Sequence, residues 1–430
     1  ILEPTRPAVH LPNSMIRVFP ARADQLDDQI NYFPLTISSH RQPWLFGILP
    51  VSGTVDKLWN QEYTADKEKI RPYQYNVLLE EINTSVSFAP NARTGIFRFE
   101  FKNELDNYIR FQILNKGTLT LKDDLTITGT EEFNGMKAYV YAVSDTRILR
   151  AVFDDSKKKS LMFVGKGSKT VNIRYGISFI SIEQARENLR VESETATLEK
   201  LSTHAKKIWN EKLGQIAIKG GTQAQKIVFY TSLYRSYERM IDINEYGKYY
   251  SAYDHKVHES DKPFFVDNWL WDTYISLEPL HAILNPVMQG QKIQSYVDMY
   301  RHGGWMPSFA LLFGDNPCMT GNHAASWIAD SYFKGIRNFD VNAAYEGIRK
   351  NSLQATLLPW KNGPATILDS FYNAKGYMPA LRPGEKEFVK EVHGFEKRQS
   401  VSVTLENSYD DWCIALMAKE LGKTADATLF

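Results

Sequence analysis

An acidic residue set among aromatic side chains is the first feature of this sequence that could do chemistry. Residues 267–274 read Asp-Asn-Trp-Leu-Trp-Asp-Thr-Tyr and open an expected helix. Asp272 could accept hydrogen bonds from sugar hydroxyls while Trp269 or Trp271 stacks on a pyranose ring, as aromatic residues do at wet binding sites. Equally, Asp272 could favour the positive end of the helix dipole, with both indoles in the core. The segment by itself leaves both interpretations open.

A second polar cluster lies in residues 301–324. Glycines precede Trp305, and they let the backbone turn tightly and approach a ligand closely. Asn322 and His323 stand directly before another expected helix. Helix capping alone would explain the asparagine, and a histidine at a helix start is more often structural than catalytic. His323 is still the more informative residue, although no second histidine lies near it at metal-ligand spacing.

Histidines also occur in residues 253–259, which read Tyr-Asp-His-Lys-Val-His-Glu. This segment resembles a metal-ligand set only superficially. It lacks the two histidines at i and i+4 on one helix face that bind zinc in helical sites. We therefore expect a solvated polar loop here.

Three carboxylates follow in residues 404–412, where Glu406, Asp410 and Asp411 enter an expected helix. Paired acids can serve as general acid and general base. Neighbouring residues of a helix point about 100° apart, so Asp410 and Asp411 cannot face one substrate together. We expect one of the two to point inward.

Composition limits the classes of function. The 430 residues carry 51 Lys and Arg against 50 Asp and Glu, for a net charge of +1, and we expect no nucleic-acid partner because a polyanion binder normally shows a basic excess. No apolar run reaches the roughly 20 residues of a membrane span. A nucleophile elbow, a phosphate loop and a dinucleotide fingerprint are all missing. Aromatic residues make up 13% of the chain, so they must fill large cores or line a ligand site. Cys318 and Cys413, far apart in the sequence, are expected to be free thiols.

The spacing of apolar residues predicts a multidomain β plus α fold. Residues 1–182 alternate apolar and polar residues at period two, as in Phe97, Phe99 and Phe101, and predict an antiparallel β-sandwich. Residues 183–215 predict a helical linker. The pattern in residues 216–430 predicts amphipathic helices at 223–240, 271–284, 287–302, 324–335, 341–353 and 404–421. Paired helices with long loops suggest an α/α toroid of which only the first part is present.

Taken together, these motifs resemble glycoside hydrolase family 92, the calcium-dependent exo-acting α-mannosidases. The resemblance is specific in the helical half, where it rests on Trp271-Asp272-Thr273-Tyr274, Gly304-Trp305-Met306-Pro307, Gly321-Asn322-His323-Ala324, Ile328-Ala329-Asp330-Ser331-Tyr332 and Tyr409-Asp410-Asp411-Trp412. Residues 7–15 and 38–41 of the sandwich half support it.

The resemblance implies an N-terminal β-sandwich, a helical linker and an (α/α)6 barrel. It also implies an inverting mechanism with a Glu general acid, an Asp general base and a calcium ion on the mannose hydroxyls. In the family, the acid, the base and most calcium ligands lie in segments that match positions after Phe430, so the catalytic residues and metal ligands stay unassigned. The implied substrate is terminal mannose in N-glycans or mannans, with a preference for α-1,2 linkages. The implied compartment is periplasmic, outer-surface or extracellular, with a signal peptide already removed.

Carried over residue by residue, the resemblance implies that Asp272 contacts the terminal mannose. Trp271, Trp305, Asn322 and His323 would line the same pocket. It also implies that side chains of the sandwich reach the barrel mouth, with Trp44, His40, His10 and Asn13 as the weaker candidates. Asp330 and Asp410 are either pocket residues or hydrogen bonders between helices.

Two other interpretations stay open. One is a different toroidal glycosidase or a glycoside phosphorylase with an appended sandwich. The other is a non-catalytic glycan-binding fragment, because the acid and base are not identified within residues 1–430.

Overall fold

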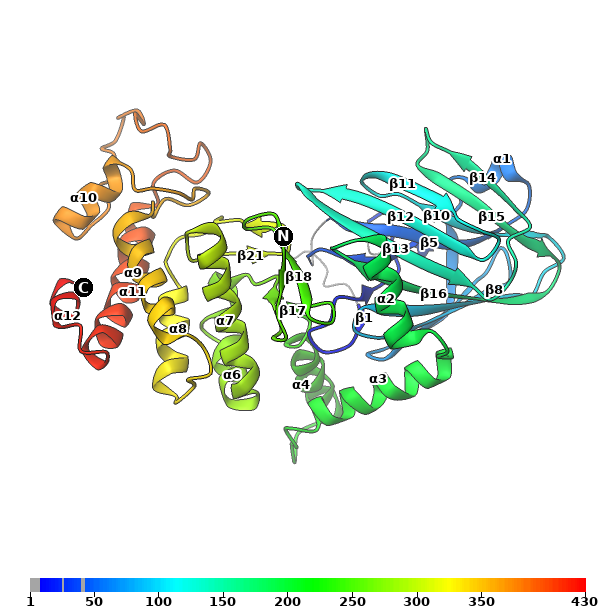
Figure 1. Cartoon of the computed structure of the whole chain (residues 1–430), viewed down its shortest axis with the longest axis horizontal. Coiled ribbons are helices and arrows are strands. Elements are labelled where there is room, and N and C mark those ends of the chain that lie inside the picture. The colour runs from blue at the N-terminus through cyan, green and yellow to red at the C-terminus, as the bar shows by residue number, and fades with distance from the viewer. Residues whose placement is uncertain (1–7, 25–26, 40–42) are drawn as a thin grey trace. The chain divides into compact units, whose positions relative to one another are not determined.

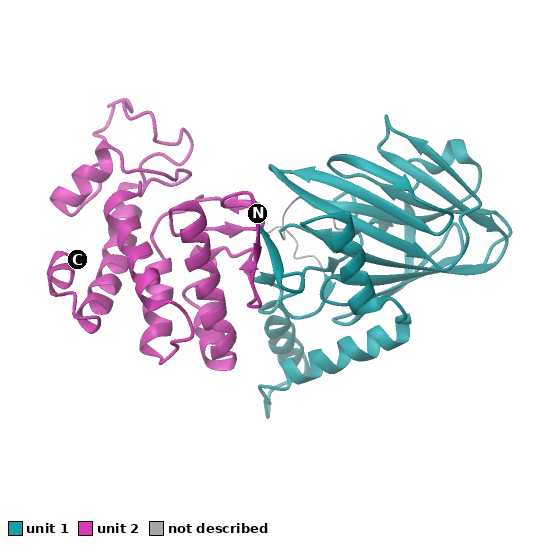
Figure 2. Ribbon diagram, in the orientation of Figure 1, with its two compact units in different colours: residues 1–250 teal, residues 251–430 magenta. Residues whose placement is uncertain are grey.

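The computed structural model describes residues 8–24, 27–39 and 43–430. It forms two compact units, residues 1–250 and residues 251–430, which are described one at a time (Figure 2). These units reflect packing, and the domain boundaries predicted at residues 182 and 215 remain predictions.

Two antiparallel sheets make up most of the first unit (Figure 1). The five-stranded sheet has the order β14(Arg150–Asp154), β15(Lys159–Lys166), β10(Asp106–Gln112), β5(Trp44–Ser52) and β4(Phe33–Ile37). The nine-stranded sheet has the order β11(Lys116–Leu121), β12(Thr126–Phe133), β13(Met136–Ser144), β16(Lys169–Ser178), β9(Thr94–Phe101), β8(Thr84–Pro90), β7(Gln74–Leu79), β6(Tyr63–Arg71) and β3(Gln29–Ile30). Short elements complete this part: β1(Val9–His10), β2(Arg17–Val18) and α1(Val55–Leu58).

The period-two alternation places one face of each sheet in a shared core. Phe97 and Phe99 of β9 are fully buried, and the ring centroid of Phe97 lies 5.7 Å from that of Phe33 on the other sheet. The hydroxyl of Tyr175 on β16 donates to the carbonyl of Leu35 on β4 at 2.8 Å. These contacts join the two sheets face to face and confirm the predicted β-sandwich.

A buried carboxylate also bridges the sheets. Glu131 on β12 accepts hydrogen bonds from the backbone amides of Phe46 (3.0 Å) and Leu114 (2.7 Å) and from Nδ2 of Asn115 (2.6 Å). Burial raises the pKa of Glu131 to about 7, although these hydrogen bonds oppose the shift. The acid therefore loses its proton close to neutral pH.

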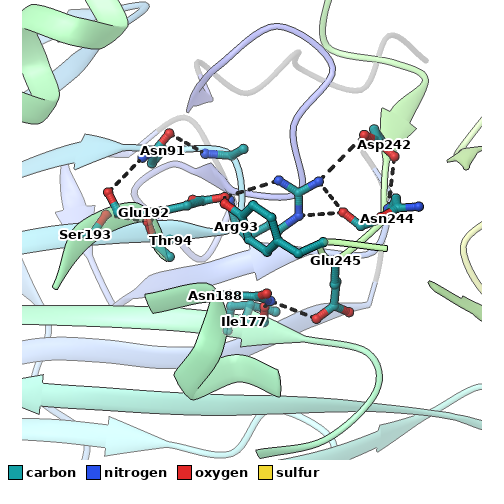
Figure 3. A network of polar contacts seen from close by, with 12 residues as sticks. Asn91, Arg93, Thr94, Ile177, Asn188, Glu192, Ser193, Asp242, Asn244 and Glu245 are labelled. Carbon is teal, nitrogen blue, oxygen red and sulfur yellow. Dashed lines mark hydrogen bonds and ion pairs between the residues drawn. The ribbon is translucent and has the colours of Figure 1, made fainter. Parts of the chain in front are cut away.

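Three helices follow the sandwich within the first unit: α2(Ile182–Ser193), α3(Leu198–Leu213) and α4(Gln223–Arg235). A polar network holds α2 and the segment after α4 against β9 (Figure 3). In it, Arg93 forms an ion pair with Glu192 of α2 at 3.2 Å, and its Nε donates to the carbonyl of Asn244 at 2.6 Å. Buried Glu245 accepts hydrogen bonds from the backbone amide of Phe179 at 2.8 Å and from Asn188 at 2.7 Å.

The second unit is mainly helical. Its elements, with β18 spanning the boundary, are β18(Lys248–Ser251), β19(Lys256–Glu259), β20(Phe265–Val266), α5(Leu270–Thr273), α6(Leu277–Leu284), α7(Pro286–Gly303), β21(Ala310–Leu311), β22(Gly314–Asp315), α8(Ala324–Phe333), α9(Val341–Gln354), α10(Ile367–Lys375), α11(Ser400–Glu420) and α12(Thr424–Leu429). The rings of Tyr296 on α7 and Trp327 on α8 meet edge to face at 5.0 Å in its core. Helices after a sandwich match the predicted fold class, and the toroid remains a prediction.

The helix predictions need four corrections. The segment predicted at 271–284 is two helices, because Pro279 lacks an amide hydrogen and its ring would clash with the carbonyl of Ile275 in a continuous helix. The helix predicted to reach residue 240 ends at Arg235. Helices α10 and α12 were not predicted, although Thr366 and Asp369 form a capping box before α10. Helix α11 begins at Ser400 instead of 404, so its β-branched start is helical.

Two further sequence-based points concern the described residues of both units. Cys318 and Cys413 form no disulfide bond there, as predicted, and both are buried. None of the helices in the described ranges has the length and apolar character needed to cross a membrane.

Candidate active site

The candidate active site is centred on His323, the residue just before α8. Its side chain is buried between α8 and α11, and its Nδ1 lies 3.1 Å from Oδ2 of Asp410. Its Nε2 lies 3.3 Å from Oε2 of Glu406, an ion pair without hydrogen-bond geometry. Burial lowers the pKa of His323, but the two carboxylates outweigh this effect and raise the pKa to about 9. The imidazole is therefore charged at neutral pH.

The two carboxylates reach His323 because they stand four residues apart on α11. Residues at i and i+4 share one face of a helix, so Glu406 and Asp410 both point at the same ring. Asp410 also accepts a hydrogen bond from the backbone amide of Asn322 at 2.8 Å. For Glu406, burial raises the pKa, yet contacts with His323 and Thr320 hold it below its ordinary value.

Other polar and aromatic groups extend this cluster. Oε2 of Glu406 accepts hydrogen bonds from Thr320 Oγ1 at 2.5 Å and from Trp271 Nε1 at 3.3 Å. The ring of Tyr274 stacks on His323 with centroids 4.0 Å apart and planes 12° apart. An electron-rich ring face against an imidazolium is a favourable cation–π arrangement. Trp271 and His323, 52 positions apart, are thus joined through one carboxylate.

A pocket opens beside His323. Its walls come from three stretches of the second unit and include Trp305, Asp315, Asn322, His323, Asn351 and Lys361. The pocket is partly open to solvent, and the space between its lining atoms, with the solvent at its mouth included, is about 590 Å³.

Asp315 is the one acid among the residues that line this pocket. It accepts hydrogen bonds from the backbone amides of Phe309 at 2.8 Å and Ser308 at 3.1 Å. Loss of solvation nevertheless raises its pKa to about 6. Asp315 can therefore give or take a proton near neutral pH.

The structure brings four of the predicted site residues together. Trp271, Asn322 and His323 belong to the Glu406 and Asp410 cluster, and Trp305 lines the adjoining pocket under Nζ of Lys350, 4.5 Å from its ring centroid. Asn322 also donates from Nδ2 to the carbonyl of Ile348 at 2.9 Å, so its side chain has a structural contact.

The other predicted residues are placed as follows. Asp272 is exposed in the first turn of α5, where its charge also suits the helix dipole. Trp269 is half-buried and packs edge to face on the buried ring of Phe309 at 5.6 Å. Trp44 lies on β5 of the first unit and contacts Phe19 and Tyr32. His40 lies outside the described residues.

The prediction about adjacent acids is confirmed. Asp410 faces His323, while Asp411 accepts hydrogen bonds from Ser352 and, at 3.2 Å, from Tyr372. Asp330 forms a surface ion pair with Lys334 at 2.6 Å.

Sequence reasoning missed Glu406 as the partner of His323. The signal was its spacing from Asp410, which places both acids on one helix face. The sequence also carried no sign that Tyr274 and Thr320 contact this cluster, because those contacts join segments far apart in the chain. Nor did it indicate that Asp315 accepts hydrogen bonds from the amides of Ser308 and Phe309.

The His323 cluster does not fit calcium. Calcium takes six to eight oxygen ligands, but Glu406 and Asp410 both face a charged imidazolium, which repels a dication. In the described ranges, the one group of three potential metal ligands is Asp254, His258 and His302, and two of its ligand atoms would be nitrogen.

Comparison with known proteins defines the protein family to which this chain belongs. The model of the glycosyl hydrolase family 92 N-terminal domain matches residues 3–178, and that of the family 92 catalytic domain matches residues 184–430. The chain therefore belongs to glycosyl hydrolase family 92, as its motifs indicate.

Solved structures agree with this assignment. A family 92 inverting mannosidase from Bacteroides thetaiotaomicron is 25% identical, with a TM-score of 0.86 over 98% of this chain and 60% of that one. A family 92 α-mannosidase from the same organism, solved with mannoimidazole, shares the fold at 22% identity and a TM-score of 0.86, over 99% of this chain and 60% of that one.

A curated relative extends the comparison to fungi. An uncharacterized secreted glycosidase of Arthroderma benhamiae is 28% identical over 263 residues, which are 60% of this chain and 29% of the relative. The chain thus spans less than two thirds of the length of the proteins it resembles.

Proposed function

We propose that this chain acts in an exo-acting α-mannosidase, which releases terminal mannose from N-glycans or mannans outside the cytoplasm. The observation that carries the proposal is the catalytic-domain match over residues 184–430, which contains the whole His323 cluster. Similarity to an inverting mannosidase supports inversion at the anomeric carbon. The relative described as secreted supports an extracellular or periplasmic location.

In this proposal the exposed carboxylate of Asp272 accepts hydrogen bonds from hydroxyls of the terminal mannose. Trp271 and Trp305 offer half-buried indole faces for the apolar face of the sugar. Asn322 and His323 form the pocket wall beneath.

The role of His323 in this proposal is electrostatic. A charged imidazole holds the pKa of Glu406 below its ordinary value and fixes Glu406 against Trp271. The indole is then held in one orientation before the sugar arrives, which reduces the entropy cost of binding.

Preference for α-1,2 linkages and dependence on calcium come from the family resemblance. The general acid, the general base and calcium remain without assigned residues, so the steps of glycosidic cleavage are not attributed to side chains of this chain.

The test is mannose release from α-1,2-mannobiose, with the α-1,3 and α-1,6 isomers as controls. We expect the fastest release from the α-1,2 isomer, with the β-anomer of mannose formed first in the NMR spectrum, and loss of activity on adding a chelator. Release of a sugar 1-phosphate only when phosphate is present would identify a phosphorylase instead. Mannose binding without turnover would identify a glycan-binding module.

A further inference from the structure

The second unit holds a group of metal-ligating side chains that the mannosidase proposal does not use. Asp254, His258 and His302 place a carboxylate oxygen and two imidazole nitrogens within 4.8 Å of one another. We propose that these three residues form a binding site for a transition-metal dication of the zinc type.

The ligand types select this class of ion. Two imidazoles with one carboxylate suit zinc and its neighbours in the first transition row, whereas calcium and magnesium prefer oxygen ligands throughout. The carboxylate supplies one negative charge against the dication. His302 also lies in the last turn of α7, where the partial negative charge of the helix end favours a cation.

The distances are close to those of an occupied site. Four-coordinate zinc with bonds of 2.0–2.1 Å needs ligand atoms about 3.3 Å apart. Nε2 of His258 already lies 3.0 and 3.1 Å from the two oxygens of Asp254. Because no separation in the group exceeds 4.8 Å, the ligand atoms need to approach one another by about 1.5 Å at most, which side-chain rotation could supply.

The two rings show where this rotation must occur. His258 and His302 stack with centroids 3.9 Å apart and planes 12° apart, so their lone pairs do not yet converge. Binding would tilt one ring out of the stack.

An outer contact supports the arrangement. Nδ1 of His302 lies 3.0 Å from Oγ of the buried Ser251. With Nδ1 donating to this hydroxyl, Nε2 is the ring nitrogen that would bind the ion. A histidine that binds a metal through one ring nitrogen usually donates a hydrogen bond from the other.

The ion would connect residues 251–259 to the end of α7, which leads into the wall of the candidate active site. Residues 251–259 carry Asp254 and His258, and a Cβ on Gly303 would lie 3.4 Å from the ring of Tyr253. Gly303 is followed by Gly304 and Trp305, which lines the pocket. Metal binding would therefore fix the start of the Trp305 loop. Three protein ligands leave a fourth position for water.

The test is zinc titration of the chelator-stripped chain by calorimetry. We expect one equivalent of zinc bound per chain, no competition from millimolar calcium, and a visible absorption spectrum of four-coordinate cobalt when Co²⁺ replaces zinc. His258→Gln and His302→Gln should each abolish the one-equivalent binding. Ser251→Ala should weaken it about 10-fold.

The matched control is His255→Asn, which changes an exposed histidine of the same segment. Its φ of +58° is tolerated by asparagine, and zinc binding should be unchanged. Failure of the unaltered chain to bind zinc, or unchanged binding by the His258→Gln/His302→Gln double variant, would overturn the proposal. If the variants do not fold, X-ray absorption of the zinc-loaded unaltered chain decides: two imidazole ligands support the site, and sulfur ligands refute it.

Discussion

Oδ2 of Asp410 lies 3.1 Å from Nδ1 of His323, across 87 positions of sequence. The same oxygen accepts the backbone amide of Asn322, so one buried carboxylate fixes both the ring and the main chain at the start of α8. Glu406, one helical turn earlier, contacts the other ring nitrogen. This relationship sets the charge, the orientation and the position of His323 at once.

Replacing His323 should remove a pH-dependent part of stability. The pKa of His323 rises from 6.5 to about 9 on folding, so its stabilising effect is complete below pH 6.5 and is lost as the pH rises through 9. The effect is on the order of 2–3 kcal/mol. Urea unfolding between pH 6 and 10 should show this fall for the unaltered chain and a flatter curve for His323→Gln. Equal slopes for both proteins would contradict the ion-pair assignment.

A buried ion pair in α6 and α7 should be sensitive to the loss of one partner. Nζ of Lys292 lies 3.5 Å from Glu278 and 2.7 Å from Nδ1 of His281, and all three side chains are fully buried. Lys292→Met should destabilise the chain by about 3–5 kcal/mol because Glu278 is left as an unpaired charge. The double variant Lys292→Met/Glu278→Gln should recover much of this loss. Denaturant unfolding would refute the prediction if the single and double variants were equally stable.

Two buried acids of the first unit should both make the folded chain less stable as the pH rises. Burial raises the pKa of Glu245 from 4.5 to about 7, and that of Glu131 likewise. Their contribution to stability is therefore complete below pH 4.5 and is lost as the pH rises through 7. Glu245→Gln resembles the protonated form, so its unfolding free energy should fall less between pH 5 and 8, by on the order of 2 kcal/mol. Asp154→Asn is the control at a half-buried acid of the same unit, and it should leave that slope unchanged because contacts with Lys157 and Ser156 lower the pKa of Asp154 to about 2.

Removing the carboxylate of Asp272 should impair mannosidase activity without affecting the fold. Asp272→Asn keeps the size of the side chain but loses the charge that would accept sugar hydroxyls. We expect kcat/KM on α-1,2-mannobiose to fall about 100-fold, a loss of about 2.7 kcal/mol in transition-state binding. Asp330→Asn changes another half-exposed acid of the helical unit and should leave kcat/KM within twofold. Equal effects of both variants would remove Asp272 from the proposed sugar site.

Period and spacing were sufficient to predict most elements of the fold. Alternation as in Phe97, Phe99 and Phe101 identifies a half-buried strand whatever its partners are, because side chains of a strand point to opposite faces. The break before α6 has a local cause, Pro279. The prediction of one continuous helix followed the periodicity of the apolar residues and did not take this proline into account. Helix α10 shows the opposite case, since its capping signals are local but its short apolar pattern is weak.

The sequence by itself determined the family, the order of sandwich and helices, and the divergence of Asp410 from Asp411. These follow from residue types at fixed spacings along one chain. Only the tertiary structure decided that Glu406 and Asp410 charge His323, that Asp315 is held by loop amides, and that His302 joins Asp254 and His258. Those groups meet through the packing of segments up to 88 residues apart, as in Asn322 and Asp410, and spacing within one segment carries no information about such meetings.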